Sequence, residues 1–260
     1  MTELARCLAF LRALDRRAAE RTVPFHFGEA YFHSSLPRVW SRNYLVAEDN
    51  LEEASAELLA AEADRILGGA GLRHRKIELH DGKIGSRLEP GFRGLGWGTE
   101  CDLVMTARRA PDRGPDLSRA EEVGFDELAP IWAKGIREGP FGVNEEVVHQ
   151  LVENKRVVMG AVETRFFAAR VDGSIASYCD LYSDGRTGQI EAVMTLEPYR
   201  NQGLARATVS SALAASREAG NDLTFLLAQQ DDWPQELYRK LGFDEIGCIY
   251  DFVRAPVASS

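Results

Sequence analysis

Residues 189–205, QIEAVMTLEPYRNQGLA, decide the fold class of this 260-residue chain. A strand-like apolar run ends in a turn that contains Pro198, and residues 200–205 then open a helix. The first backbone N–H groups of a helix have no intrahelical partner and carry a partial positive charge, so a phosphate placed there accepts their hydrogen bonds. Gly203 has no Cβ and lets a phosphate approach the backbone closely. The alternative is a glycine in an ordinary strand-to-helix turn.

This loop and a second motif together resemble a known protein family. Arg200, Gly203 and Ala205 resemble the acyl-CoA signature of the GNAT superfamily of N-acyltransferases, which reads Arg or Gln, two residues, Gly, one residue, then Gly or Ala. Residues 236–243, ELYRKLGF, are similar to the family's second signature, L-Y-x-x-L-G-F. The resemblance extends over 117–254. It implies an α/β (α+β) GNAT fold, in which helices flank a central mixed, mostly antiparallel sheet.

The resemblance also implies an activity. GNAT proteins pass an acyl group directly to an amine, so we expect an acetyl-CoA-dependent N-acetyltransferase that forms a ternary complex with a primary amine. The acceptor is a small molecule or a peptide, and the sequence singles out neither. Two alternatives stay open. One is a non-catalytic acyl-CoA-binding sensor or regulatory protein, and the other is transfer of a different acyl group, such as succinyl or propionyl.

The same resemblance implies that acetyl-CoA contacts the strand that ends near Thr195 and the loop of residues 200–205. The pantetheine arm lies along the strand like an added strand, which implicates Val193, Met194 and Thr195. The pyrophosphate meets the loop and the first helical turn, at Arg200, Asn201, Gln202, Gly203, Leu204, Ala205 and Arg206. The acetyl carbonyl is expected near Val193, where two strands splay apart and a backbone N–H stabilises an oxyanion.

Two side chains are expected to move protons. Tyr238 is the tyrosine of the second signature, and a phenol with a pKa of about 10 keeps its proton at neutral pH and can donate it to the leaving CoA thiolate. Glu191 stands where many relatives keep an acidic residue, and it takes the amine proton directly or through water. The alternatives are a tyrosine that only packs and hydrogen-bonds the cofactor, and a glutamate that is solvated, salt-bridged or only orients the substrate.

One position departs from the family pattern. Relatives often carry an asparagine before the tyrosine, where it binds the pantetheine, and this chain has Asp231 there. An ionised carboxylate accepts hydrogen bonds but cannot donate one. We expect Asp231 to contact the cofactor in an altered way, or Gln230 to supply the contact instead.

A stretch rich in Pro, Gly and Asp, residues 110–116, predicts a linker. It separates a domain of residues 1–110 from the acetyl-CoA-binding domain of residues 117–260. Residues 36–43 in the first domain form an aromatic and polar stretch, which either lines the acceptor pocket or packs between the two halves.

A faint repeat relates the two halves. Residues 95–97, LGW, and residues 241–243, LGF, each precede a strand, and the strand–helix–strand order around them recurs. Together with a resemblance to bacterial two-part GNAT proteins, the repeat predicts a tandem protein with a smaller, degenerate GNAT-like first half. That half has no glycine in the counterpart of the phosphate loop, and Phe92 stands where the second half has Tyr238.

The hydrophobic periodicity predicts the individual elements. Helices are expected at 2–21, 51–67, 125–138, 145–154, 204–219 and 233–241. Strands are expected at 43–47, 76–80, 99–107, 165–171, 174–181, 189–196, 223–228 and 247–254. Asp172 and Gly173 join two of these strands as a two-residue hairpin.

Composition narrows the possible functions. The formal net charge of −9 comes from residues 111–260, which argues against a nucleic-acid partner and fits either solubility or a cationic substrate. No apolar run approaches the roughly 20 residues of a membrane span, and charges interrupt the first helix too often for a signal peptide. The four cysteines and five histidines lack metal-site spacing. We expect a cytoplasmic protein without a metal or a membrane partner, either a monomer or a homodimer.

Overall fold

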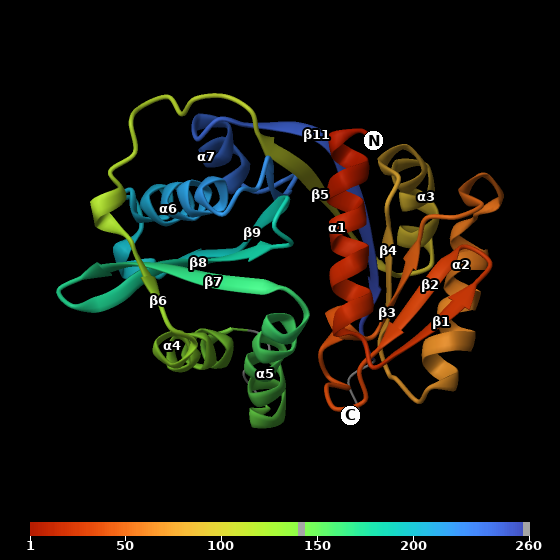
Figure 1. Cartoon of the computed structure of the whole chain (residues 1–260). Coiled ribbons are helices and arrows are strands. Elements are labelled where there is room, and N and C mark those ends of the chain that lie inside the picture. Colours follow the sequence, from red (N-terminus) through yellow and green to blue (C-terminus); the bar gives the residue numbers. More distant parts are fainter. Residues whose placement is uncertain (140–143, 257–260) are drawn as a thin grey trace. The chain divides into compact units, whose positions relative to one another are not determined.

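The computed structural model describes residues 1–139 and 144–256 (Figure 1). The chain divides into two compact units. The C-terminal unit consists of Met1–Phe10, Val104–Ala228 and Asp232–Ile246. The N-terminal unit consists of Leu11–Leu103, Gln229–Asp231 and the residues from Gly247 onward.

This division does not follow a single cut in the sequence. The stretch 110–116, expected as a linker, belongs to the C-terminal unit. The strands β5 (Gly98–Ala107) and β11 (Phe243–Arg254) each contribute residues to both units. Domains at 1–110 and 117–260 therefore remain a prediction from the sequence.

The sheet of the C-terminal unit is mixed and mostly antiparallel, as expected. Besides β5, its strands are β6 (Glu121–Val123), β7 (Glu163–Val171), β8 (Ser174–Ser183), β9 (Thr187–Thr195) and β10 (Leu223–Gln229). They lie in the order β5-β10-β9-β8-β7-β6. The strands β6 to β9 pair antiparallel, and β10 runs parallel to β9. The turn between β7 and β8 is the expected hairpin, with Asp172 and Gly173 at φ 50° and 78°.

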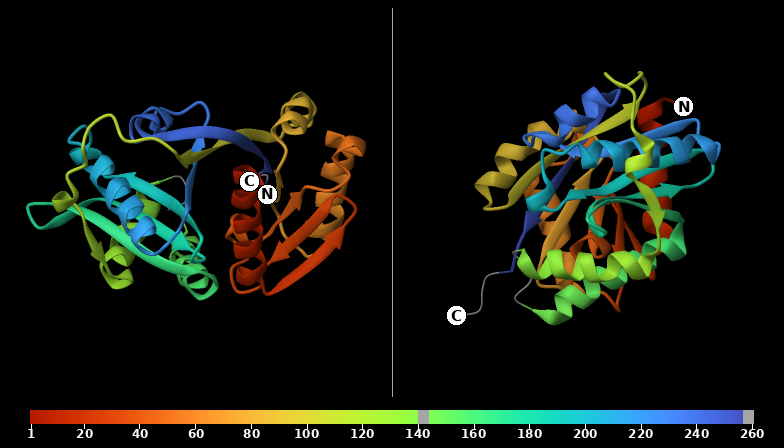
Figure 2. Two further views of the ribbon diagram at one scale, coloured as in Figure 1. Left: turned by 45° about the horizontal axis from the view of Figure 1, so that its top comes forward. Right: turned by 90° about the vertical axis from the view of Figure 1, so that its left-hand side faces the viewer.

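Helices cover both faces of this sheet. They are α4 (Phe125–Glu138), α5 (Glu145–Ala161) and α6 (Leu204–Glu218). The helix α6 packs on β7, β8 and β9, where Leu204 clusters with Ala176. On the other face, Trp132 of α4 clusters with Phe166. Figure 1 shows α6 on one side of these strands and α4 and α5 on the other, and both views in Figure 2 agree.

The N-terminal unit has its own core. Its elements include α1 (Glu3–Ala18), which also reaches the other unit, and β1 (Arg21–Phe25), β2 (Gly28–Phe32), β3 (Tyr44–Ala47), α2 (Ala56–Ala63), β4 (Arg75–Leu79) and α3 (Gly82–Gly94). The strands follow the order β1-β2-β3-β4-β11. Leu59 of α2 and Phe92 of α3 are fully buried with Ile77 and Phe252, so the two helices share one core with the strands.

The prediction of one helix over 51–67 is wrong. The chain forms a 3₁₀ turn at Leu51–Glu53, then α2, and then a π-helical turn at Asp64–Gly68. Ser55 separates the first two because its backbone is extended, at φ −126° and ψ 162°, and its hydroxyl accepts a hydrogen bond from the Leu58 N–H at 3.2 Å. A serine in this geometry begins a new helix.

The sequence analysis also missed some elements and shortened one. The helix α3 was not predicted, because its sequence contains four glycines and Pro90, all poor helix formers. Asp81 caps it by accepting hydrogen bonds from the N–H groups of Lys83 and Ile84. The β1–β2 hairpin and the short strand β6 were missed as well, and α5 ends at Ala161 rather than at 154.

The order of elements agrees with the expected duplication. The series β2-β3-α2-β4-α3-β5 matches β8-β9-α6-β10-α7-β11, where α7 is Pro234–Lys240. In each series the second and third strands pair parallel. Gly96 and Gly242, the glycines of the two repeat strings, both have left-handed φ, at 76° and 91°. That the first half is a degenerate GNAT copy remains a proposal.

We predict that Gly242→Ala destabilises the protein more than Gly96→Ala. Both changes force a left-handed residue to carry a Cβ, which costs about 1–2 kcal/mol. Only at Gly242 does the new Cβ meet backbone, 2.2 Å from the carbonyl oxygen of Arg109, whereas nothing lies within 4 Å at Gly96. Urea unfolding of both variants tests this, and equal midpoints would contradict it.

Candidate functional site

The loop between β9 and α6 presents the first turn of the helix. A 3₁₀ turn at Glu197–Tyr199 leads into Asn201 and Gly203, whose φ angles of 62° and 76° are left-handed. Gly203 is the N-cap of α6. A Cβ on Gly203 would lie 3.6 Å from Arg119 Nη1, an ordinary contact, so the backbone angle rather than a lack of room selects glycine there.

A groove of about 740 Å³ runs along this loop in the C-terminal unit. It gathers nearly all of the residues predicted to contact acetyl-CoA, namely Val193, Met194, Thr195, Arg200, Asn201, Gly203, Leu204, Ala205, Arg206 and Tyr238. Residues that the sequence analysis did not predict also line it, namely Arg113, Tyr199, Asp232, Trp233, Pro234, Leu237 and Lys240. The groove therefore unites the end of β9, the start of α6 and the helix α7.

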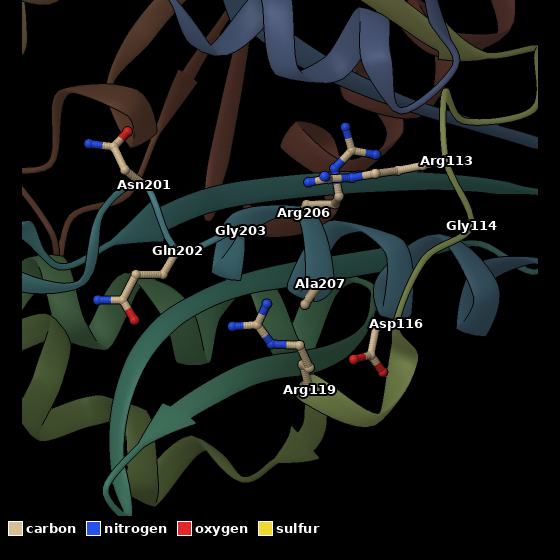
Figure 3. A pocket seen from close by; sticks show the side chains of 9 residues that line it. All are labelled: Arg113, Gly114, Asp116, Arg119, Asn201, Gln202, Gly203, Arg206 and Ala207. Atoms are coloured by element: carbon tan, nitrogen blue, oxygen red, sulfur yellow. The ribbon is translucent and has the colours of Figure 1, made fainter.

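A second cavity of about 410 Å³ lies beside the start of α6 and is lined by Gln202. Three guanidinium groups surround it, those of Arg113, Arg119 and Arg206 (Figure 3). Arg206 also forms an ion pair with Asp112, at 2.7 Å. The sequence analysis read 110–116 only as a linker and so missed Arg113. No signal in the sequence joins Arg113 to the loop at 200–205, because the two segments lie far apart along the chain.

The strand β9 loses its regular pairing where the groove begins. Its parallel register with β10 runs from Thr187↔Leu223 to Ile190↔Leu226, although both strands continue further. On its other side a β-bulge shifts the register with β8, and Ala192 in the bulge has φ 53°. A non-glycine residue at this angle is strained, which is typical of functional sites.

Tyr238 lies in α7 and is almost fully buried, with 5% of its surface exposed. Its ring packs edge-on against Phe243, with the ring centroids 6.3 Å apart. Burial raises the pKa of this phenol above its ordinary value, and the charges of Glu191, Cys179 and Asp232 raise it further. Tyr238 therefore keeps its proton throughout the physiological pH range, as a proton donor must until it is used.

Glu191 is half-buried on β9, next to the bulge. Its Oε2 accepts a hydrogen bond from the side-chain amide of Gln189, at 2.9 Å. Burial raises the pKa of its carboxyl and is the largest effect; Lys155 lowers that pKa and Asp180 raises it. A carboxyl with a raised pKa is a stronger proton acceptor than an exposed one, as a general base near neutral pH requires.

The sequence analysis missed Asp180 and Lys155. Asp180 lies directly opposite Glu191 on β8 and is completely buried. Lys155 of α5 reaches it, with Nζ 2.5 Å from Oδ2. The available signal was an acidic residue inside the otherwise apolar run of β8.

Asp231, which was predicted to contact the cofactor, belongs to the other unit, and its role stays a prediction.

The sequence itself matches a family. Residues 136–243 match the model of the acetyltransferase (GNAT) family. The groove, the loop and Tyr238 lie in or beside this segment. Residues 136–243 therefore match a GNAT acetyltransferase domain, as the two sequence signatures indicated.

Solved structures confirm the fold. A conserved protein of unknown function from Staphylococcus epidermidis aligns with a TM-score of 0.68 at 14% identity, over 90% of this chain and 93% of its own. A GCN5-related N-acetyltransferase from Kribbella flavida aligns with a TM-score of 0.64 at 19% identity, over 96% and 94%. A tandem GNAT protein from the clavulanic acid biosynthesis pathway reaches 0.54 at 13% identity, over 78% and 70%. No curated protein sequence matches the chain significantly.

Residues 1–139 and 144–256 contain neither a candidate membrane span nor a candidate metal cluster. No helix in this part of the chain is both long and apolar enough to cross a membrane. Nor do three or more His, Cys, Asp or Glu side chains of these residues gather in a way that would hold a metal ion.

We predict that Arg113→Gln and Arg119→Gln each weaken the binding of CoA by about tenfold, because a hydrogen bond to a charged group contributes roughly 1.5–3 kcal/mol. Both guanidinium groups line the cavity at the start of α6. Calorimetric titration with CoA measures the change. Arg217→Gln, an exposed arginine at the other end of α6, is the control and should leave the affinity unchanged. Wild-type affinity in both cavity variants would show that the arginines do not contact CoA.

Proposed function

We propose that this protein transfers the acetyl group of acetyl-CoA directly to a primary amine, in a ternary complex of the two substrates. The observation that carries the proposal is the single groove in which the start of α6, the end of β9 that has left the register with β10, and Tyr238 lie together. Each of these features suits a different part of acetyl-CoA.

The start of α6 suits the pyrophosphate. Its first N–H groups lack intrahelical partners and lie at the positive end of the helix dipole. Gly203 keeps this end free of a side chain, and Arg113, Arg119 and Arg206 add positive charge. Together they supply the donors and the charge that a diphosphate needs.

The strand β9 suits the pantetheine arm. Val193, Met194 and Thr195 line the groove and lie beyond the last residue of β9 that is in register with β10. Their backbone groups on that side are available for an added strand. The bulge at Ala192 turns the backbone immediately before Val193, where we place the acetyl carbonyl and the N–H group that stabilises its oxyanion.

Two protonation changes complete the transfer. The amine nitrogen bonds to the acetyl carbon and loses a proton, which Glu191 accepts directly or through water. The carbon–sulfur bond breaks, and the sulfur takes a proton from Tyr238. The buried environment suits both roles, because it strengthens Glu191 as a base and keeps Tyr238 protonated.

The acceptor is proposed only by class, as a primary amine of a small molecule or a peptide. Two alternatives remain beside it. A sensor would bind acetyl-CoA without releasing thiol in the presence of an amine, and an enzyme for a larger acyl group would prefer succinyl-CoA or propionyl-CoA. Thiol release, measured across a panel of amines and acyl-CoA donors, separates the three.

We predict that Gly203→Glu abolishes the binding of acetyl-CoA. The new carboxylate would take the phosphate position at the helix start and repel the phosphates. The measurement is calorimetric titration of acetyl-CoA against the folded variant.

Gly185→Glu is the matched control for this experiment. Gly185 is also left-handed, at φ 84°, and has nothing within 4 Å of its Cβ position, but it lies in the turn between β8 and β9. This variant should bind like the wild type. Equal binding by all three proteins would contradict a cofactor site at α6.

We predict that Glu191→Gln lowers kcat/KM strongly at neutral pH and less at high pH, where the amine loses its proton to solvent. The wild-type rate should fall as the pH is lowered and Glu191 becomes protonated. Because the pKa of Glu191 is raised, this fall should occur at a higher pH than it would for an exposed glutamate. The assay is thiol release with the best amine of the panel.

The control is Glu197→Gln, an exposed glutamate in the turn after β9. Its pH profile should match that of the wild type. If Glu191→Gln keeps wild-type rates at all pH values, Glu191 is not the base.

A further inference from the structure

A buried ion pair lies behind Glu191 on the face of the sheet that α4 and α5 cover. Asp180 of β8 has no exposed surface. Its Oδ2 accepts hydrogen bonds from Lys155 Nζ at 2.5 Å and from the Tyr182 hydroxyl at 3.0 Å. The Lys155 ammonium also lies 5.3 Å from the centroid of the Trp132 ring. The pair is thus enclosed by aromatic side chains in the core of the C-terminal unit.

This pair is in register with Glu191. Asp180 faces Glu191 across the β8–β9 ladder, and Tyr182 faces Gln189. Side chains that are directly opposite on one face have Cβ atoms about 4.5–5.5 Å apart. Gln189 donates a hydrogen bond to Glu191. Lys155, Asp180, Tyr182 and Gln189 therefore form one row of side chains that ends at Glu191, the general base of the proposed reaction.

A buried ion pair is weak evidence for a stabilising role. A buried ion pair repays the cost of removing two charges from water only when its geometry and hydrogen bonds are excellent, and apolar residues often replace it without loss. Here Asp180 Oδ1 and Gln189 Oε1 are buried and find no hydrogen-bond partner among the described residues. Buried oxygens without partners are uncommon in folded proteins, so these two atoms indicate that the side chains have a role other than packing.

We propose that Lys155 and Asp180 are positioning residues for Glu191, which hold its carboxyl beside the bulge and set the pH range in which it accepts the amine proton. The inference rests on the proposed function, in which Glu191 is the base. The titratable groups that bear on Glu191 are Lys155 from α5, Asp180 and Tyr182 from β8, and Tyr238 from α7.

The two members of the pair act on Glu191 in opposite directions. The positive charge of Lys155 favours the ionised carboxylate, and the negative charge of Asp180 disfavours it. Removing the lysine leaves two carboxyl groups facing each other, so Glu191 should bind its proton more tightly. Removing the charge of Asp180 leaves an uncompensated ammonium nearby, so Glu191 should release its proton more readily.

The experiment measures the proton affinity of Glu191 without any acceptor. The protein is labelled with ¹³C at the glutamate side-chain carboxyls, and the Glu191 resonance is assigned by its loss in Glu191→Gln. Its titration midpoint should rise by about one pH unit in Lys155→Met and fall by about one pH unit in Asp180→Asn. The double variant should return close to the wild-type midpoint.

Two further variants serve as controls. Lys155→Arg keeps the charge and should keep the midpoint near that of the wild type. Lys134→Met removes an exposed lysine of α4, which pairs with Glu138 at 3.8 Å, and should change nothing. If one single variant does not fold, the shift of the other from the midpoint of the wild type still tests the sign expected for the charge that it removes.

The result separates this inference from the proposed function. A midpoint that stays fixed, or that moves the same way in both single variants, overturns the positioning role even if the enzyme acetylates amines. Opposite shifts support it even if no acceptor has been found. Where an acceptor is known, the acid limb of kcat/KM should move with the NMR midpoint.

Discussion

The architecture of the site depends on the point at which β9 stops pairing with β10. Up to Ile190 the strand is held by β10, and immediately afterwards the bulge at Ala192 disturbs its register with β8. A strand that kept both partners would have no backbone groups left for a ligand. Because β9 loses β10 as a partner after Ile190, Val193–Thr195 line the groove, and the strand runs into the loop whose end is the start of α6.

Burial around this point divides the proton chemistry between two residues. The same loss of water raises the pKa of Tyr238 and that of Glu191, but the consequences differ. A phenol that starts with a high pKa becomes a persistent donor, whereas a carboxyl that starts low moves toward neutrality and becomes a better base. In the proposed function, one environment thus prepares an acid and a base, provided that a nearby charge keeps Glu191 ionised. Lys155, paired with Asp180, is placed to supply that charge.

The sequence identified what is local and missed what depends on contacts between distant segments. The phosphate-type loop, Tyr238 and Glu191 could be found because each belongs to a short motif or stands beside one. Arg113 and the Lys155–Asp180 pair could not, since their partners lie on segments far away in the sequence. The helix α3 was hidden for a related reason. Gly85, a poor helix former, is required there because a Cβ would lie 2.3 Å from the ring of Tyr250, a contact that only the fold creates.

The two halves show which part of the motif carries function. Both series place a left-handed glycine after a helix and before a strand, and both pair their second and third strands parallel. These features maintain the fold, so they persist in either half. In the first half the helix α2 begins at Ser55, whose own hydroxyl occupies an N–H group of the first turn, and Phe92 is stacked on Phe252 without a hydroxyl. A helix start capped by its own side chain offers fewer donors to a phosphate, and a buried phenylalanine has no proton to donate. The proposed chemistry is therefore assigned to the half in which Gly203 leaves the helix start uncapped and Tyr238 carries a hydroxyl.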